Sequence, residues 1–257
     1  MATDRLPLVM LHGWGLHAGM MQPLAGRLAP AGPVTCIDLP GHGGRPFEPA
    51  FTGLDELAGA IAQDLPPACC LLGWSLGGMV AARLAAAGHP AVRRLVLVAS
   101  TPRFVQGEGW AHGLEPAFVA EFAAELERDY RGLVRRFLSL QARGDERQGE
   151  LLRTLRAAVF SRGEPDPSAL RAGLGILTHA DLRGEAGRIA VPTLVLAGQY
   201  DRLTRPEAGA WWAGAIPGAS FTGIPGAGHA PFLSHPGEAA SHLAAFLGGT
   251  VRAQGHA

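Results

Sequence analysis

The sequence predicts an α/β fold in which a mostly parallel central sheet is flanked by helices and carries an inserted helical cap. Short apolar runs alternate with longer stretches of helical periodicity, which is typical of parallel strands joined by crossover helices. The runs are almost continuously apolar, as expected for strands that are buried on both faces. The alternation is interrupted once, between residues 101 and 190, where only helical periodicity is present.

The expected elements follow from this alternation. Strands are expected at residues 8–11, 34–38, 70–74, 95–99, 193–198 and 220–224. Helices of the core are expected near residues 20–29, 54–65, 76–87, 205–215 and 236–247. Three apolar stripes with helical spacing mark the cap, and they consist of Phe118, Phe122 and Leu126, of Leu133, Phe137 and Leu140, and of Leu151, Leu155 and Val159. We therefore expect a first part of the core at 1–100, the cap at 101–190 and a second part of the core at 191–257.

Composition excludes several classes of function. The chain has 257 residues, with 22 basic and 22 acidic side chains, so general binding to nucleic acid is not expected. All the basic residues are arginine. Without lysine, the chain can form neither a Schiff base nor a phosphate-binding loop that ends in Gly-Lys-Ser/Thr.

Cysteine usage and hydropathy predict the compartment. The three cysteines, Cys36, Cys69 and Cys70, include two neighbours and make a poor disulfide framework, which favours a reducing environment. The N-terminal sequence has no signal-peptide pattern, and no apolar stretch reaches the length of about twenty residues that spans a bilayer. We therefore expect a cytoplasmic monomer with no membrane contact.

The strongest functional signal surrounds Ser75. The sequence Gly73-Trp74-Ser75-Leu76-Gly77 follows an apolar run and precedes a helical pattern, which is the strand–turn–helix context of a G-x-S-x-G nucleophile elbow. A serine on so tight a turn must adopt a strained backbone, and Cβ atoms at Gly73 and Gly77 would collide with neighbouring backbone. A chance match in a chain with 36 glycines is the alternative.

A serine hydroxyl becomes a good nucleophile only when a base removes its proton. His229 follows the last expected strand, where a loop can place its imidazole over the sheet edge, and His235 is the nearby competitor. A carboxylate must then hold the imidazole, and Asp201 follows the strand at 193–198. Asp38 is interpreted as a turn residue.

An oxyanion hole requires two donors directed at the developing negative charge. The backbone N–H of Leu76 is expected to supply one donor, and the N–H of Trp14, in the loop after the first strand, the other. Both residues would then contact the substrate. The indoles of Trp14 and Trp74 either line the pocket or pack in the core, and His12 is expected to hydrogen-bond within its own turn.

These residues lie in strings that resemble the α/β-hydrolase superfamily over nearly the whole chain. The strings are His12-Gly13-Trp14-Gly15, Asp38-Leu39-Pro40-Gly41-His42-Gly43, Gly73-Trp74-Ser75-Leu76-Gly77-Gly78, Asp201 and Gly228-His229-Ala230-Pro231-Phe232. The chain order Ser, Asp, His is also that of these hydrolases. More narrowly, the strings at 11–16, 73–78, 136–141 and 230–236 resemble the pimeloyl-[acyl-carrier-protein] methyl ester carboxylesterases of biotin synthesis.

The chain departs from this family twice. Members usually begin with an antiparallel hairpin, but few residues precede the first expected strand here, so we expect this edge of the sheet to be absent. The loop after Asp38 usually ends in a serine, and here it reads Gly43-Gly44-Arg45-Pro46. We therefore do not expect this chain to make the contacts that the serine hydroxyl makes in other members of the family.

The cap is basic although the whole chain is neutral, because residues 128–171 contain ten arginines and six acidic residues. Either these arginines cover solvated helix faces, or, as the resemblance implies, they form a docking surface for an acidic carrier protein. The candidate docking residues are Arg131, Arg135, Arg136, Arg153 and Arg156. The resemblance also implies that Phe137, Leu140 and Gln141 face inward and contact the acyl part of the substrate.

The sequence thus predicts a serine carboxylesterase with Ser75, Asp201 and His229 as its catalytic residues and with no metal or organic cofactor. The substrate that the resemblance implies is the methyl ester of a pimeloyl group on acyl-carrier protein. Lactonases, C–C hydrolases and perhydrolases of the same fold would share these residues, as would slow ligand receptors. Sustained turnover of short p-nitrophenyl esters distinguishes an enzyme from a receptor.

Overall fold

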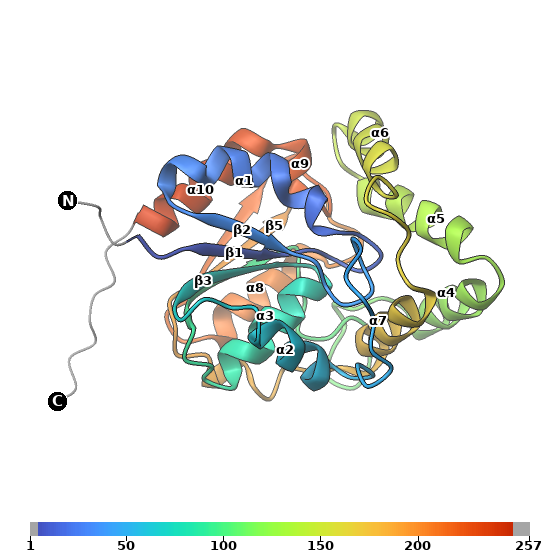
Figure 1. Ribbon diagram of the computed structural model, residues 1–257, viewed down its shortest axis with the longest axis horizontal. Coiled ribbons are helices and arrows are strands. Elements are labelled where there is room, and N and C mark those ends of the chain that lie inside the picture. Colours follow the sequence, from blue (N-terminus) through green and yellow to red (C-terminus); the bar gives the residue numbers. More distant parts are fainter. Residues whose placement is uncertain (1–4, 249–257) are drawn as a thin grey trace.

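The computed structural model describes residues 5–248, and within them six strands form a single sheet (Figure 1). The strands are β1 (Leu8–Leu11), β2 (Val34–Ile37), β3 (Cys69–Trp74), β4 (Val92–Val98), β5 (Thr193–Gly198) and β6 (Ser220–Ile224). Their order across the sheet is β2-β1-β3-β4-β5-β6, and every neighbouring pair is parallel. The predicted α/β class is confirmed.

Helices cover both faces of the sheet (Figure 1). One face carries α1 (Gln22–Leu28), α9 (Pro231–Ser234) and α10 (Pro236–Gly248). The other face carries α2 (Leu54–Ala62), α3 (Leu76–Ala86) and α8 (Pro206–Ala215). Short 3-10 helices lie at Ala18–Met21, Ala29–Ala31 and Ala186–Arg188. Because both faces are covered, β1, β3 and β5 are buried along their whole length.

Four helices inserted between β4 and β5 form the cap. They are α4 (Pro116–Arg128), α5 (Tyr130–Ala142), α6 (Gln148–Ala158) and α7 (Pro167–His179). They lie beyond the carboxyl ends of the strands (Figure 1). Most of the predicted apolar stripe residues are buried, whereas Phe118 and Leu140 are only partly covered. These two partly covered side chains line a groove that is described below.

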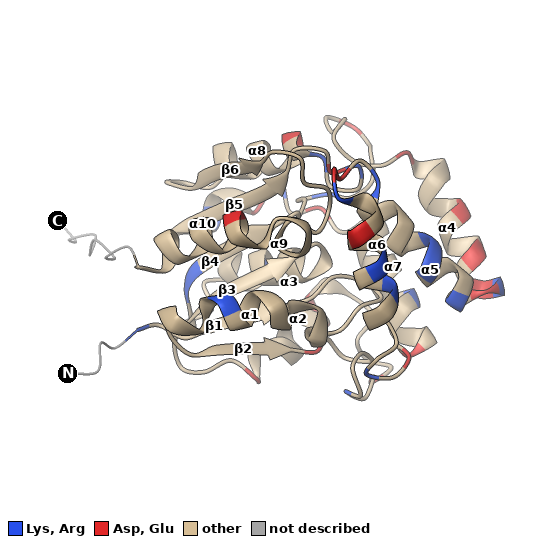
Figure 2. Cartoon of the chain, turned by 90° about the horizontal axis from the view of Figure 1, so that it is seen from above, with Lys and Arg blue, Asp and Glu red and all other residues tan. Residues whose placement is uncertain are grey.

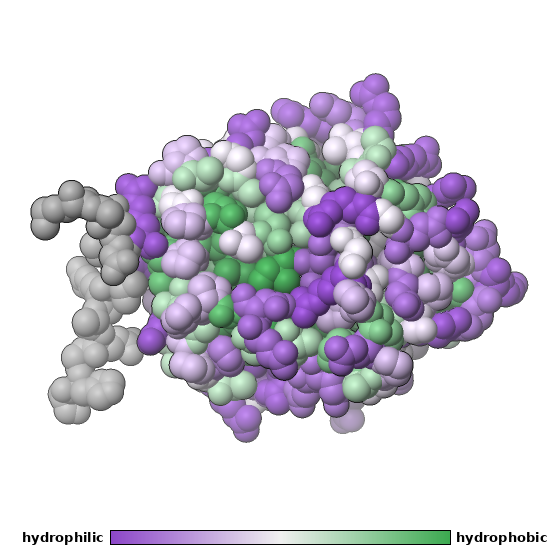
Figure 3. All heavy atoms as spheres, in the orientation of Figure 1, coloured by the Kyte–Doolittle hydropathy of each residue, from purple (hydrophilic) through white to green (hydrophobic). Residues whose placement is uncertain are grey.

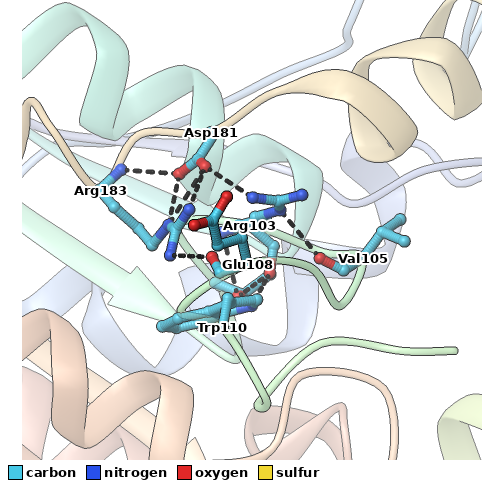
Figure 4. A network of polar contacts seen from close by, with 7 residues as sticks. Arg103, Val105, Glu108, Trp110, Asp181 and Arg183 are labelled. Carbon is cyan, nitrogen blue, oxygen red and sulfur yellow. Dashed lines mark hydrogen bonds and ion pairs between the residues drawn. The ribbon is translucent and has the colours of Figure 1, made fainter. Parts of the chain in front are cut away.

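A network of polar contacts joins the two connections between core and cap (Figure 4). Asp181, after α7, accepts hydrogen bonds from Arg103, before α4, at 3.1 Å and from Nε of Arg183 at 2.8 Å. Arg183 also donates to the carbonyl of Glu108 at 3.1 Å, and the indole of Trp110 donates to the carbonyl of Arg103 at 2.8 Å. The chain therefore enters and leaves the cap at one hydrogen-bonded junction.

The start of β4 differs from the prediction. The strand begins at Val92 rather than at residue 95. The prediction missed its first three residues because two arginines precede the apolar run. Arg93 is exposed, but Arg94 is buried, and its guanidinium donates to the carbonyl of Leu247 at 3.1 Å and lies 5.6 Å from the ring centroid of Phe246. A buried arginine whose partners lie in α10 cannot be recognised from the hydropathy pattern.

The two edges of the sheet are β2 and β6, and no antiparallel strand pairs with either edge within residues 5–248. On the face seen in Figure 3, apolar surface gathers around β2, whose Val34, Cys36 and Ile37 are half-buried, while the cap is mainly hydrophilic. No helix in the described part of the chain is both long and apolar enough to cross a bilayer. The described residues also contain no cluster of three side chains suited to a metal ion.

Candidate active site

Ser75 lies between the end of β3 and the start of α3 in a strained backbone conformation. Its φ of 55° and ψ of −117° are unusual for a residue with a side chain. Two contacts hold this turn: the Ser75 N–H donates to the carbonyl of Val98 at 3.0 Å, and the Ser75 carbonyl accepts from Oγ of Ser100 at 2.9 Å. The strain predicted for the elbow is present.

The glycines beside Ser75 allow close backbone approach. A Cβ atom at Gly73 would lie 2.1 Å from the carbonyl oxygen of Gly77, and one at Gly77 would lie 2.6 Å from the carbonyl oxygen of His12. Neither distance is possible for a real carbon–oxygen contact, so the predicted collisions are confirmed. The elbow can therefore pack directly against the loop that follows β1.

Asp201 and His229 form a buried pair. The distance between Nδ1 of His229 and Oδ2 of Asp201 is 2.8 Å, and the two residues are 1% and 2% exposed, respectively. The Asp201 carboxylate also accepts from the N–H groups of Leu203 and Thr204 at 2.8 and 3.0 Å and from Oγ1 of Thr204 at 2.8 Å. Four donors therefore fix the orientation of this carboxylate, which faces Nδ1 of the imidazole as the acidic member of a Ser-His-Asp triad does.

The backbone around His229 is fixed from both sides. From the core, Nε1 of Trp74 donates to the His229 carbonyl at 2.8 Å. From the cap, the carbonyl of Gln141 accepts from the His229 N–H at 3.2 Å, and the buried carboxylate of Asp145 accepts from the Gly228 N–H at 2.7 Å. The position of the imidazole thus depends on the cap as well as on the sheet.

The residue before Ser75, Trp74, packs against this pair. The Trp74 and His229 rings lie 5.8 Å apart between centroids, and Ser75 is the next residue in the chain. No hydrogen bond joins Oγ of Ser75 to the imidazole among residues 5–248. Hydrogen bonds between a nucleophile and its base are often long without substrate and shorten in the complex.

The loop after β1 lies against the nucleophile. A Cβ atom at Gly13 would be 3.2 Å from Cβ of Ser75, and the following Trp14 N–H has no hydrogen-bond acceptor among the described residues. Leu76 is the first residue of α3, where amides have no acceptor within the helix and the helix dipole favours negative charge. Both predicted oxyanion donors therefore belong to segments that flank Ser75.

His12 holds this loop in place. Its Nε2 accepts from the Leu39 N–H at 2.9 Å, so the neutral ring carries its proton on Nδ1, which lies 2.8 Å from the carbonyl of Gly13. Burial lowers the pKa of His12 well below its usual value, and the ring stays neutral at pH 7. This is the local hydrogen bond that the sequence predicts. Asp38 instead accepts from the Ala18 N–H at 2.6 Å, away from the Asp201–His229 pair.

An apolar slot lies between the cap and the loop after β1. Its walls are Trp14, Phe104, Leu114, Phe118, Val119, Phe122, Phe137, Leu174, Leu177 and Leu203. The ring of Trp14 meets that of Phe137 edge-on at 5.1 Å, and its Nε1 donates to the carbonyl of Leu170 in α7 at 2.9 Å. Trp14 therefore belongs both to the predicted oxyanion loop and to the wall of the apolar slot.

The other residues predicted to contact substrate lie in different surroundings. Leu140 lines an open groove next to the slot. Gln141 and Leu76 are buried outside both hollows, and the amide group of Gln141 has no partner among the described residues. Trp74 belongs to the core, where it packs edge-on against Phe232 at 4.9 Å.

The five predicted docking arginines fall into two groups. Arg131 pairs with Glu164, and Arg136 pairs with Glu125, so their charges are partly neutralised. The exposed Arg135, Arg153 and Arg156 make no ion pair within residues 5–248. Figure 2 shows acidic positions on α4 and basic positions on α5, at the same end of the molecule. The sequence count of arginines overstated the free positive charge of the cap.

Three residues that support the site were not found from the sequence. Thr204 bonds the Asp201 carboxylate, Ser100 bonds the Ser75 carbonyl, and Asp145 bonds the Gly228 N–H. Thr204 and Ser100 follow strands, which is a weak signal for a site residue. Nothing in the sequence marks Asp145, because its partner is more than eighty residues away in the chain.

The chain is similar to known proteins over nearly its whole length. The sequence is 44% identical to a pimeloyl-[acyl-carrier protein] methyl ester esterase of Stenotrophomonas maltophilia, over 98% of this chain and 97% of the relative. An esterase from Exiguobacterium antarcticum, 22% identical, has a TM-score of 0.83 and covers 95% of this chain and 92% of its own. An enol-lactonase from Burkholderia xenovorans, 21% identical, has a TM-score of 0.81 over the same shares.

The pattern of one family extends over nearly all of the described chain. It matches residues 8–242, a span that runs from β1 into α10 and includes the elbow, the cap and the Asp201–His229 pair. We conclude that this chain belongs to the alpha/beta hydrolase family.

Proposed function

We propose that this chain is a serine carboxylesterase that hydrolyses the methyl ester of a pimeloyl group carried on acyl-carrier protein. The observation that carries the proposal is the 44% identity, over 98% of the chain, to a protein named for that reaction. The strained Ser75 and the buried Asp201–His229 pair supply the chemistry that such a hydrolysis needs.

In the proposed mechanism, the imidazole of His229 takes the proton of Ser75 as the Ser75 oxygen attacks the ester carbonyl carbon. The N–H groups of Trp14 and Leu76 donate to the oxyanion of the tetrahedral intermediate. The intermediate collapses, and methanol leaves with the proton from His229. Water, deprotonated by His229, then attacks the acyl-enzyme, and the Ser75 oxygen leaves with the proton from His229 as the free acid is released. Asp201 holds the imidazole throughout.

The apolar lining of the slot suits the acyl part of this substrate. The free volume of the slot is only about 10 Å³, so the side chains that line it must move apart to admit the chain. The methylene chain of a pimeloyl group has no polar atoms between its two ends, so it loses no hydrogen bonds when it leaves water. The slot walls are aromatic and aliphatic, and burial of each methylene there contributes about 0.8 kcal/mol. Trp14 and Phe137 meet inside the slot, and we propose that both contact the chain. We propose that Leu140 contacts the substrate from the groove and Leu76 through its N–H group, whereas Gln141, which is buried outside both hollows, reaches the substrate only when the cap moves.

The cap arginines form the proposed docking surface for the carrier. Three of them have no acidic partner in the described chain: Arg135, Arg153 and Arg156. The other two, Arg131 and Arg136, are paired with Glu164 and Glu125, and these ion pairs must break before the arginines can bind carboxylates of the carrier. Arg153→Glu is expected to lower kcat/KM for carrier-bound ester relative to a p-nitrophenyl ester. Equal losses on both substrates would contradict docking at this surface.

We further propose that the protein works as a monomer in the cytoplasm. The support for a reducing compartment is that Cys36, Cys69 and Cys70 are all free thiols. Burial raises the pKa of Cys70 to about 12, so this thiol stays protonated and unreactive. Sedimentation of the purified protein tests the monomer, and fractionation of cells tests the compartment.

The experiment that tests the function follows methanol release from methyl pimeloyl-carrier protein. Sustained release, together with rescue of a biotin auxotroph that lacks the methyl ester esterase, is the expected result. A single burst without further turnover would identify a receptor. Turnover of lactones or p-nitrophenyl esters without any release of methanol from the carrier-bound ester would identify another hydrolase of this family.

A further inference from the structure

An open groove between the cap and the core continues outward from the apolar slot. Its volume is about 560 Å³, and its walls are Leu114, Glu115, Phe118, Leu140, Arg143, Gly144, Arg202, Leu203 and Arg205. Leu114, Phe118 and Leu203 also line the slot. The groove and the slot therefore adjoin and share one wall, with the larger, open groove on the solvent side.

The wall of the groove is positively charged. Arg143, Arg202 and Arg205 are exposed, and none of the three makes an ion pair or a side-chain hydrogen bond among residues 5–248. Glu115 is the one acidic residue of the groove wall, and it has no ion pair in that range either. This contrasts with Arg131 and Arg136 on the cap surface, which have acidic partners.

The three arginines come from separate parts of the fold. Arg143 follows α5, whereas Arg202 and Arg205 lie between β5 and α8. The turns that carry them are in contact, because a Cβ atom at Gly144 would lie 2.8 Å from the carbonyl of Tyr200 and 3.6 Å from Nε of Arg202. Arg205 also precedes α8, whose first amides add partial positive charge. The charges therefore converge at the junction of cap and core.

A ligand that matches the slot and the groove has an apolar chain and, farther out, a negative group. In a carrier-bound substrate, the carboxyl group at the outer end of the acyl chain is a neutral thioester. The first negative group beyond it is the phosphodiester of the phosphopantetheine arm. Guanidinium groups bind phosphate oxygens through paired, charge-assisted hydrogen bonds.

We propose that Arg143, Arg202 and Arg205 bind the phosphodiester of the phosphopantetheine arm, at a site separate from the carrier-docking arginines of the cap. This inference rests on the proposed function. The arm enters through the groove, its phosphate stays at the rim, and the acyl chain passes between Phe118 and Leu203 into the slot. The arginines thereby select substrates on a phosphorylated arm.

The test uses two methyl pimeloyl thioesters without any carrier protein, one on phosphopantetheine and one on pantetheine. They differ only in the phosphate, and neither can engage the docking surface. We expect the wild type to show a kcat/KM about tenfold higher for the phosphorylated thioester, the size expected for several partly exposed charge-assisted contacts. In the triple variant Arg143→Gln, Arg202→Gln, Arg205→Gln, the ratio is expected to fall to about one.

A matched control removes three arginines far from the groove, through Arg27→Gln, Arg93→Gln and Arg188→Gln. These three are exposed, and their side chains make no contact with another charged group in the described chain. The control variant should keep the wild-type ratio, and raising the salt concentration should lower that ratio in the wild type.

Three outcomes would overturn the site: a wild-type ratio near one, a triple variant that keeps the wild-type ratio, or a control variant that loses it. Failure of the proposed function has a different signature, because the wild type would then release methanol from neither thioester nor from the carrier-bound ester. Thermal unfolding of each variant shows whether a changed ratio comes from the site or from a damaged fold.

Discussion

The backbone at Ser75 illustrates, at the scale of single residues, how a fold stabilises an unfavourable conformation. A φ of 55° in a non-glycine residue costs about 1–3 kcal/mol. The hydrogen bonds to Val98 and from Ser100 anchor the turn to the ends of neighbouring segments. These contacts keep the hydroxyl at the carboxyl edge of the sheet, beside the loop that carries Trp14.

The approach of Gly77 to the loop after β1 gives the first prediction. In Gly77→Ala, the new Cβ would lie 2.6 Å from the His12 carbonyl oxygen and 2.7 Å from that of Leu11. The loop that carries Trp14 must move away, and displacing a catalytic group by about 1 Å lowers the rate by about a hundredfold. The measurement is kcat/KM on a p-nitrophenyl ester.

The matched control for this prediction is Gly59→Ala in α2, where no atom lies within 4 Å of the new methyl group. Alanine is favoured over glycine in a helix by about 0.5–1 kcal/mol, so this variant should unfold at a slightly higher temperature and keep its activity. Full activity in Gly77→Ala would show that the two loops do not need their close contact.

The candidate catalytic residues are easier to predict from the sequence than the residues that hydrogen-bond to them. Ser75, Asp201 and His229 stand in short strings with a fixed local context, so local pattern is sufficient to find them. Thr204 and Asp145 act through hydrogen bonds to groups that only the fold brings near. Their polar side chains look like ordinary loop residues until the partner is known.

At the scale of elements, the cap and the catalytic loop are coupled through the turn after α5. Asp145 in that turn is 5% exposed, and its carboxylate accepts from the Gly228 N–H at 2.7 Å and from the Arg147 N–H at 2.8 Å. The carbonyl of Gln141, at the end of α5, bonds the His229 N–H. A movement of α5 therefore changes the position of the imidazole.

This coupling gives a second prediction. Asp145→Ala leaves the Gly228 N–H buried without an acceptor, which costs about 1–3 kcal/mol and releases the loop. We expect kcat to fall by about tenfold to a hundredfold with little change in KM, whereas Asp145→Asn, which keeps an acceptor oxygen, should recover most of the activity. Equal kcat values for Asp145→Ala and the wild type would contradict this role.

A third prediction concerns the junction where the chain enters and leaves the cap. The Arg183 side chain, hydrogen-bonded to the Asp181 carboxylate, holds the pKa of Asp181 below its usual 3.8. A carboxyl group whose pKa is lower in the folded state stabilises that state above the unfolded pKa, and this stabilisation is lost as the pH falls through the folded pKa.

Asp181→Asn should therefore lower the unfolding temperature by about 2–3 °C at pH 7, as expected for a loss of up to 1 kcal/mol in a mostly exposed network. The difference from the wild type should shrink as the pH falls below 3.8. Unfolding temperatures measured across this pH range provide the check. A difference that does not change with pH would show that the charge of Asp181 does not stabilise the junction.

Most elements were predictable because strands buried on both faces leave continuous apolar runs in the sequence and amphipathic helices leave a helical period. The start of β4 was missed because Arg94 looks like an exposed residue in the sequence. In the structure it is buried and donates to the carbonyls of Phe246 and Leu247, which lie 152 and 153 positions farther along the chain. The helices of the cap follow their apolar stripes, but the groove depends on where Phe118 and Leu140 remain partly uncovered. Local periodicity carries no information on such gaps.

For the whole molecule, a net charge of zero does not show which charged side chains are paired and which are not. Arginines on the cap find acidic partners 11 and 33 residues away in the chain, as in Arg136–Glu125 and Arg131–Glu164. Arg143 and Arg202, at the groove, find none in the described part of the chain. A sequence count shows how many arginines there are, but only the fold shows which of them are free to bind an anion.

The overall account depends on Ser75 acting as the nucleophile on the carbonyl of an ester whose chain occupies the slot. The most direct test measures kcat for methanol release from methyl pimeloyl-carrier protein with Ser75→Ala, using Ser241→Ala, an exposed serine on α10, as the control. We expect Ser75→Ala to lower kcat by about a million-fold, as in other serine hydrolases, and Ser241→Ala to match the wild type. A Ser75→Ala enzyme that retains more than about a hundredth of the wild-type kcat would contradict the account.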